Sequence, residues 1–171
     1  MQDYPHLAFH KRWEISPEIA FMLGQCQAMV SSICEIPLNP NDYNNLLRIQ
    51  LIRGAQATTA IEGNTLSEEE VADVEAGKEL PPSKRYQEIE VKNILAAMNQ
   101  ILREVTQQNK TAKITPELLL RFHEIIGQDL GEHFDADPGK LRTDARTVGR
   151  YKCPPHDQVK EHIQRMSLIH I

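Results

Sequence analysis

Apolar residues recur every three or four positions through most of the chain, and proline, glycine or strongly polar stretches separate these repeats. The spacing places the apolar side chains of each repeat on one face, which is the pattern of an amphipathic α-helix. Helices are therefore expected over residues 16–35, 41–61, 67–77, 83–108 and 115–131, and from about residue 156 onward. The pattern predicts an all-α fold.

Capping residues support the expected helix boundaries. Ser16 and Asn41–Asp42 carry side-chain oxygens that can accept hydrogen bonds from the free amide groups of a first helical turn. Ser67 is followed three residues later by Glu70, which is the spacing of a capping box. Gly63 follows the second expected helix, at the position where a left-handed residue ends many helices.

Residues 137–155 follow a different pattern, with apolar side chains dispersed among charged ones. Pro138-Gly139 and Gly149 interrupt this stretch. Such a segment favours a β-hairpin or an irregular flap over a helix. The expected organisation is an N-terminal arm and first helix over residues 1–40, a second helical region over 41–80, and a core over 81–171 with the longest helix, the flap and a last helix.

Composition and charge narrow the class of protein. Hydrophobic residues make up 40% of the 171 residues and aromatic residues only 5%, which favours helices over sheets. The 19 basic and 24 acidic residues give a net charge of −5, so no nucleic-acid surface is expected. The sequence shows no signal peptide and no apolar run of membrane-spanning length, and a cytoplasmic protein is expected.

The three cysteines are Cys26, Cys34 and Cys153, and no two of them form a C-x-x-C pair. An odd number without such a pair fits neither a disulfide framework nor a zinc site. Cys26 and Cys34 lie within one apolar helical stretch, where they are expected to fill a core.

Common catalytic and nucleotide-binding motifs are missing from the sequence. It has no Walker A loop and no G-x-G-x-x-G, and no nucleophile–base arrangement can be assigned, so no catalytic residue is nominated. Glu132, His133, Asp135 and Asp137 form the densest polar cluster. Such a loop more often caps and solvates a helix end than binds a metal, and no metal site is predicted.

Glu62 stands at the end of the second expected helix, near the negative end of the helix dipole. A carboxylate there is disfavoured by a few tenths of a kcal/mol, roughly, unless a cation such as an arginine pairs with it. The alternative is a solvated glutamate beside a glycine cap, and elementary physics favours this second interpretation.

Two motifs nevertheless resemble those of the Fic family of protein adenylyltransferases. Thr58-x-x-x-Glu62-Gly63 is similar to the family's inhibitory motif. The segment that begins Pro138-Gly139-x-x-Arg142 and continues through Val148-Gly149 to Pro154-Pro155 resembles the family's flap. The motifs occur in the family's order and span most of the chain, roughly from residue 41 to residue 155.

The resemblance implies a helical bundle of the Fic type and a transfer of AMP from ATP to a hydroxyl side chain of a target protein, with Mg²⁺. A histidine in an H-P-F-x-x-G-N-G-R loop serves as the general base in such enzymes. Glu62 would inhibit by pairing with an arginine that should hold the γ-phosphate, Thr58 would keep the inhibitory helix in register, and Gly63 would end it. Thr147, Val148 and Gly149 would belong to the flap that receives the target by strand pairing.

The chain departs from the family in one respect: the 171 residues contain no H-P-F-x-x-G-N-G-R loop. The last histidine, His170, lacks that context. The resemblance therefore implies a Fic bundle that is incomplete at its C-terminus, binds neither ATP nor Mg²⁺ tightly and is inactive by itself. Loss of the last helices would expose apolar stripes of the long helix, so a homo-oligomer or a rearranged packing is expected.

A second hypothesis is a non-enzymatic helical module that acts in trans on a Fic protein or another partner, since an inhibitory helix can be supplied by a separate chain. A DNA-binding module is the weakest hypothesis, because the chain is acidic and no helix has a basic face.

Overall fold

The computed structural model describes residues 14–108, 114–134 and 136–167, and this part of the chain is mostly helical with one small β-hairpin. The expected N-terminal arm, Asp135 and His170 lie outside the described residues. The helices are α1 (Pro17–Cys34), α2 (Pro40–Ile61), α3 (Glu68–Glu75), α4 (Arg85–Gln108), α5 (Pro116–Gly127) and α6 (His156–Ser167), with 3-10 turns at η2 (Pro82–Lys84) and η3 (Gly131–His133). The hairpin pairs β1 (Thr147–Val148) with β2 (Tyr151–Lys152). The predicted fold class, all-α with a small hairpin, is confirmed.

Two of the three helix-start caps predicted from the sequence are confirmed. Ser16 accepts a hydrogen bond from the Ile19 amide, and Ser67 and Glu70 form both bonds of a capping box. The expected cap of α2 at Asn41–Asp42 is wrong by two residues. Asn39 is the cap, because its Oδ1 accepts from the Asp42 amide at 2.9 Å and the fixed φ of the following proline suits the first helical turn.

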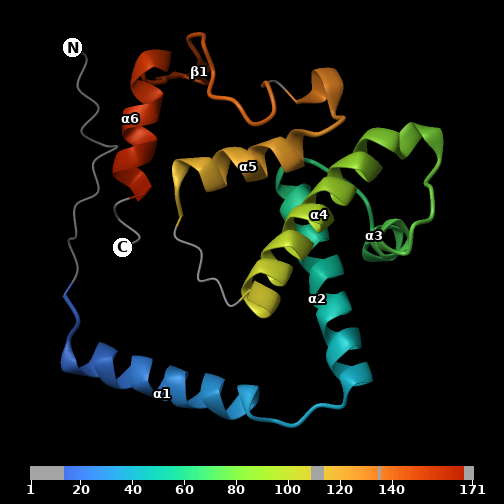
Figure 1. Ribbon diagram of the computed structural model, residues 1–171, viewed down its shortest axis with the longest axis vertical. Helices are drawn as coiled ribbons and strands as arrows, with labels where there is room; N and C mark the ends of the chain where they lie inside the picture. Colours follow the sequence, from blue (N-terminus) through green and yellow to red (C-terminus); the bar gives the residue numbers. More distant parts are fainter. Residues whose placement is uncertain (1–13, 109–113, 135, 168–171) are drawn as a thin grey trace.

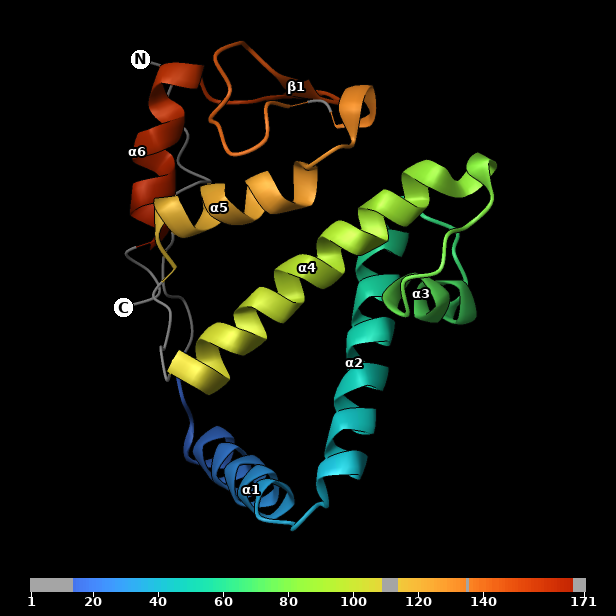
Figure 2. The same ribbon diagram turned by 45° about the vertical axis from the view of Figure 1, so that its right-hand side comes forward.

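The centre of the molecule is a three-helix unit of α2, α3 and α4, and α5 packs on α4 while α6 packs on α5 (Figures 1 and 2). Its core consists of aliphatic side chains, namely Ile52, Ala55, Leu66, Val71, Val74, Val91, Ile94 and Leu95. Met98 of α4 and Ile126 of α5 pack against this core while remaining partly exposed. The core therefore holds the end of α2 against α4, which places the Thr58–Gly63 segment.

Helix α1 does not bury any residue. Cys26 and Cys34 are exposed, so the prediction that they fill a core is wrong. The helical spacing of α1 is confirmed, but none of the described elements covers the face that this spacing creates. In α4, by contrast, Ile94 and Leu95 are buried and only Ile101 and Val105 of the apolar stripe are strongly exposed. The uncovered apolar surface thus lies chiefly on α1.

One fully buried carboxylate fixes the start of α4. Glu88 is 0% exposed, and it accepts hydrogen bonds from the Leu80 amide at 3.0 Å, from Arg85 at 2.9 Å and from Lys92 at 2.6 Å. These donors keep the buried charge satisfied, as a buried carboxylate requires. Because Leu80 lies before η2, the same side chain ties the α3–α4 connection to α4.

Within the described residues, no helix is long and apolar enough to cross a membrane.

Candidate functional site

The end of α2 has a well-defined backbone geometry. Glu62 is the C-cap, and Gly63 follows with φ at +94°, the left-handed conformation that the sequence predicted. The Asn64 amide donates to the Thr59 carbonyl and the Gly63 amide donates to the Ala60 carbonyl, each at 3.1 Å. These two bonds are those of a Schellman motif, which satisfies the last carbonyl groups of a helix.

Replacing Gly63 with alanine is expected to lower the free energy of unfolding by about 1–2 kcal/mol, because a Cβ disfavours the left-handed conformation. No heavy atom lies within 4 Å of the Cβ position at Gly63, so the loss comes from the backbone and not from a clash. Urea unfolding measures the change. Gly24→Ala is the control, since Gly24 lies inside α1 with open space around it and should lose no stability. Equal stability of the Gly63 and Gly24 variants would contradict the strained-glycine explanation.

Asn64, the residue after Gly63, clamps the end of α2 to α4. Its Nδ2 donates to the Gln87 carbonyl at 3.1 Å and to Glu90 Oε2 at 2.7 Å, while its Oδ1 accepts from the Leu66 amide at 3.0 Å. Asn64 and Glu90 are both buried. The position of the helix end is thus set by contacts beyond the helix itself. This clamp was not among the sequence predictions; the Asn64-x-Leu66 spacing of an Asx-turn indicates only the local bond to the Leu66 amide.

The side chains of Thr58 and Glu62, in the first of the two motifs, point to solvent, since both residues are exposed. The neighbouring Thr59 is the buried threonine, and its hydroxyl donates to the Ala55 carbonyl at 3.0 Å. Among the described residues, no cation forms an ion pair with Glu62. The arginine partner that the sequence suggested for Glu62 is therefore not found among the described residues.

Tyr86 of α4 connects this helix end to the next part of the fold. Partial burial raises the pKa of the Tyr86 phenol, and the negative charges of Glu90 and then Glu62 raise this pKa further. The Tyr86 ring packs on the His133 ring of η3, with 4.2 Å between the ring centroids. The Glu62 carboxylate is therefore close enough to Tyr86 to raise its pKa, and Tyr86 in turn contacts η3, which precedes the flap segment.

The second motif forms the predicted hairpin. Thr147 pairs with Lys152 and Val148 pairs with Tyr151, and Gly149 takes a positive φ of 58° at the turn. A glycine at the first central position of a two-residue loop is characteristic of a tight hairpin turn. Val148 and Tyr151 are exposed, so both strands of the hairpin display large side chains to solvent.

Arg142 and Gly139 hold the flap segment in place. The Arg142 guanidinium donates to the Asp144 carbonyl at 2.6 Å and to the Pro154 carbonyl, so it joins the two legs of the flap. The Gly139 amide donates to His123 Nδ1 at 2.9 Å and anchors the segment to α5. Gly139 has φ at +75°, and a Cβ there would lie 3.0 Å from the Glu124 Cβ. These contacts give a structural reason for the Pro-Gly-x-x-Arg pattern.

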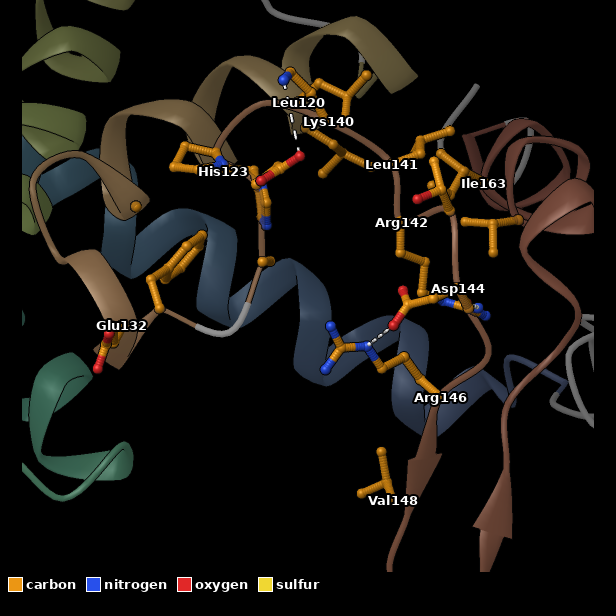
Figure 3. A pocket seen from close by; sticks show the side chains of 18 of the residues that line it. Leu120, His123, Glu132, Lys140, Leu141, Arg142, Asp144, Arg146, Val148 and Ile163 are labelled. Atoms are coloured by element: carbon orange, nitrogen blue, oxygen red, sulfur yellow. Dashed lines mark hydrogen bonds and ion pairs between the residues drawn. The ribbon is translucent and has the colours of Figure 1, made fainter.

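A cavity of about 1310 Å³ opens between α5, α6 and the flap segment (Figure 3). Its lining includes apolar side chains from all three, among them Leu120, Leu141 and Ile163. This volume exceeds the range of about 300–1,000 Å³ that is usual for small-molecule sites, and the lining also includes charged side chains such as Asp144 and Arg146. We refer to it as the α5–α6 cleft.

The basic side chains of the α5–α6 cleft already have partners. Arg146 Nε lies 3.0 Å from Asp144 Oδ2, as Figure 3 shows, and Lys140 lies 3.8 Å from Asp137. Arg142 is engaged by the two carbonyl groups of the flap. A triphosphate needs several uncommitted donors or a loop of backbone amides. In the α5–α6 cleft, Lys140, Arg142 and Arg146 are therefore already engaged by groups of the flap segment.

The structure places the two motifs on separate elements, the end of α2 and the hairpin between α5 and α6. Comparison with models of known protein families finds no match, and neither does comparison with curated proteins.

Proposed function

We propose that the chain is the regulatory and target-docking portion of a Fic-type protein adenylyltransferase, with Glu62 as the inhibitory carboxylate. The observation that carries this proposal is the end of α2: a solvent-facing glutamate stands on a helix terminus that a Schellman motif and the buried Asn64 hold in place. A carboxylate displayed in this way is ready to form a charge-assisted bidentate pair with an arginine.

The flap supports the same proposal. An exposed two-stranded hairpin, fixed at its base by Arg142 and Gly139, presents backbone groups that an extended segment of a target protein can pair with. Thr147, Val148 and Gly149 lie at the tip of this hairpin. The target is a protein with a hydroxyl side chain near the docked segment.

The chemistry of AMP transfer belongs to residues outside this chain, because the 171 residues contain no H-P-F-x-x-G-N-G-R loop. ATP and Mg²⁺ would be held by that catalytic portion, which supplies the phosphate-binding groups. We propose that helices carrying the loop dock in the α5–α6 cleft, where apolar side chains such as Leu120 and Ile163 would pack against them. The chain by itself is then expected to transfer no AMP.

A regulatory role in trans is the second candidate function. The observation that favours it is that Glu62 is exposed and forms no ion pair with the described residues, so its carboxylate is accessible to a separate protein. In this version, the chain lowers the activity of a complete Fic protein by presenting Glu62 to the arginine of that protein's nucleotide site.

The test uses a Fic-type adenylyltransferase whose own inhibitory glutamate has been replaced by glycine, with AMP transfer measured from labelled ATP. Adding the 171-residue chain is expected to lower transfer, and Glu62→Gln should weaken the inhibition by about 10- to 100-fold, the range for one lost charge-assisted contact. The matched control is Glu69→Gln, an exposed carboxylate on the neighbouring α3.

The outcomes separate the two candidates. Inhibition that depends on Glu62 supports a role in trans. In a second format, the chain is co-expressed with a separate polypeptide that bears the catalytic loop. If AMP transfer appears only with both polypeptides, and Glu62→Gln increases it, the chain is the regulatory portion of a Fic enzyme. Labelling by the chain alone, or no effect of Glu62→Gln in either format, would refute the proposal.

A further inference from the structure

Helix α1 carries an apolar seam along one face. Its members follow one another at alternating spacings of three and four residues, and they are Ile19, Met22, Cys26, Met29 and Ile33. All five positions are exposed, and no residue from 19 to 34 carries a charge. A repeat of this kind is the seam by which two α-helices pack side by side.

The described part of the chain provides no cover for this seam. Figures 1 and 2 show α1 projecting from the start of α2, away from the three-helix unit of α2, α3 and α4. The apolar surface continues onto the first turns of α2, where Tyr43, Leu46 and Ile49 are exposed. Monomeric soluble proteins rarely expose a contiguous apolar surface of this extent.

The charge pattern decides what kind of partner suits α1. A helix that lies on an anionic lipid surface needs lysine or arginine on its polar face, and α1 has neither. A charged partner would bury its charges against an uncharged helix without compensation. The best match is therefore another helix with an uncharged apolar seam, and α1 of a second copy meets this requirement, because its one charged residue, Glu18, precedes the seam in the first turn.

We propose that the chain forms a two-fold dimer in which α1 of one copy packs along its seam against α1 of the other. Helix α1 has 18 residues and a length of roughly 27 Å, at 1.5 Å per residue. Half of the side surface of a helix this long, with a diameter of about 10 Å, is roughly 420 Å² for each copy. Two copies would bury about 850 Å² through α1 alone, and the exposed Tyr43, Leu46 and Ile49 of α2 extend the apolar surface beside it, which places the contact at the small end of specific interfaces.

The two-fold geometry gives Cys26 a distinctive place. It is the middle member of the five-residue seam, with two seam residues before it and two after it. In an isologous contact the residue nearest the axis meets its own counterpart, so Cys26 of one copy lies beside Cys26 of the other. Cys34 follows the last seam residue and lies off the seam, and Cys153 is in the flap region.

The test combines light scattering with cysteine cross-linking of the whole chain. The chain is expected to be a dimer at micromolar concentration and to form a disulfide-linked dimer on mild oxidation. Cys26→Ser should abolish the cross-link and leave the non-covalent dimer intact, while Cys34→Ser and Cys153→Ser should have no effect on either.

A charge on the seam should separate the copies. Met29→Glu is expected to weaken dimerisation at least about 100-fold, because it buries two unpaired carboxylates at the contact. Gln27→Glu places the same charge off the seam and should leave the dimer unchanged. Since both positions are exposed in one copy, circular dichroism should show unaltered helix content. A monomeric wild-type chain, or a dimer whose cross-link runs through Cys34 or Cys153, would overturn the proposal.

Discussion

Replacing Asn64 with alanine is expected to lower the free energy of unfolding by about 3 kcal/mol, a large effect for one polar side chain. Asn64 is 9% exposed and Glu90 is 8% exposed. The substitution removes the donor 2.7 Å from Glu90 Oε2 and the acceptor of the Leu66 amide. A carboxylate and an amide are then left buried without these partners, and each retains its full desolvation penalty.

A double-mutant cycle identifies the source of this loss. Glu90→Leu in the Asn64→Ala background removes the buried carboxylate together with its donor. The loss in free energy of unfolding of the double variant should therefore be about 1–2 kcal/mol smaller than the sum of the losses of the two single variants. Thr65→Ala is the matched control, because Thr65 is exposed and bonds to Gln87 only at the surface. Additive losses, or an effect of Asn64→Ala no greater than that of Thr65→Ala, would show that the clamp does not hold the helix end.

Replacing Glu88 with alanine is expected to lower the free energy of unfolding by about 3 kcal/mol, measured by urea unfolding near neutral pH. Glu88 is 0% exposed, and its removal leaves both a small cavity and a Leu80 amide without its acceptor. Arg85 and Lys92 have side chains that are 55% and 42% exposed, so they regain water readily and contribute little to the loss.

The same carboxylate makes stability dependent on pH. The hydrogen bond from Lys92 lowers the pKa of Glu88 below its ordinary value of 4.5, aided by the Leu80 amide and opposed by burial. Because the pKa is lower in the folded state, the stabilisation is fully present above the ordinary value and is lost as the pH falls through the folded one. The hydrogen bond from Lys84 lowers the pKa of Glu70 in the same direction.

Urea unfolding between about pH 3 and pH 7 tests this dependence. Glu88→Gln keeps an acceptor for the Leu80 amide but cannot ionise, so its stability should fall less steeply on the acid side. Lys92→Met should move the acid loss to higher pH, because the pKa of Glu88 then rises. Identical acid slopes for the wild type and Glu88→Gln would contradict the assignment.

Local patterns in the sequence predicted the helices well, because helical spacing and caps depend on residues only a few positions apart. The capping box at Ser67 and Glu70 and the left-handed Gly63 are examples of such local chemistry. The start of α2 was predicted two residues late, since Asp42 and Asn39 are both suitable capping residues. Only their mutual hydrogen bonds show that Asn39 is the cap and Asp42 its partner.

Contacts between distant residues could not be predicted in the same way. Asn64 and Glu90 are 26 positions apart, and nothing near either residue indicates that the other will be buried beside it. The apolar spacing of α1 predicted a face that requires cover, but it gave no information about what covers it, and Cys26 was wrongly placed in the core. Glu62 was singled out by a motif, whereas its local environment alone favoured a solvated side chain.

The three-helix unit of α2, α3 and α4 affects the order in which the protein forms during synthesis. Its core residues run from Ile52 to Leu95, so all its principal contacts join helices that are close in the sequence. N-terminal units of a chain fold while later residues are still being added. The helix end that displays Glu62 can therefore be assembled on the ribosome before α5, the flap and α6 emerge.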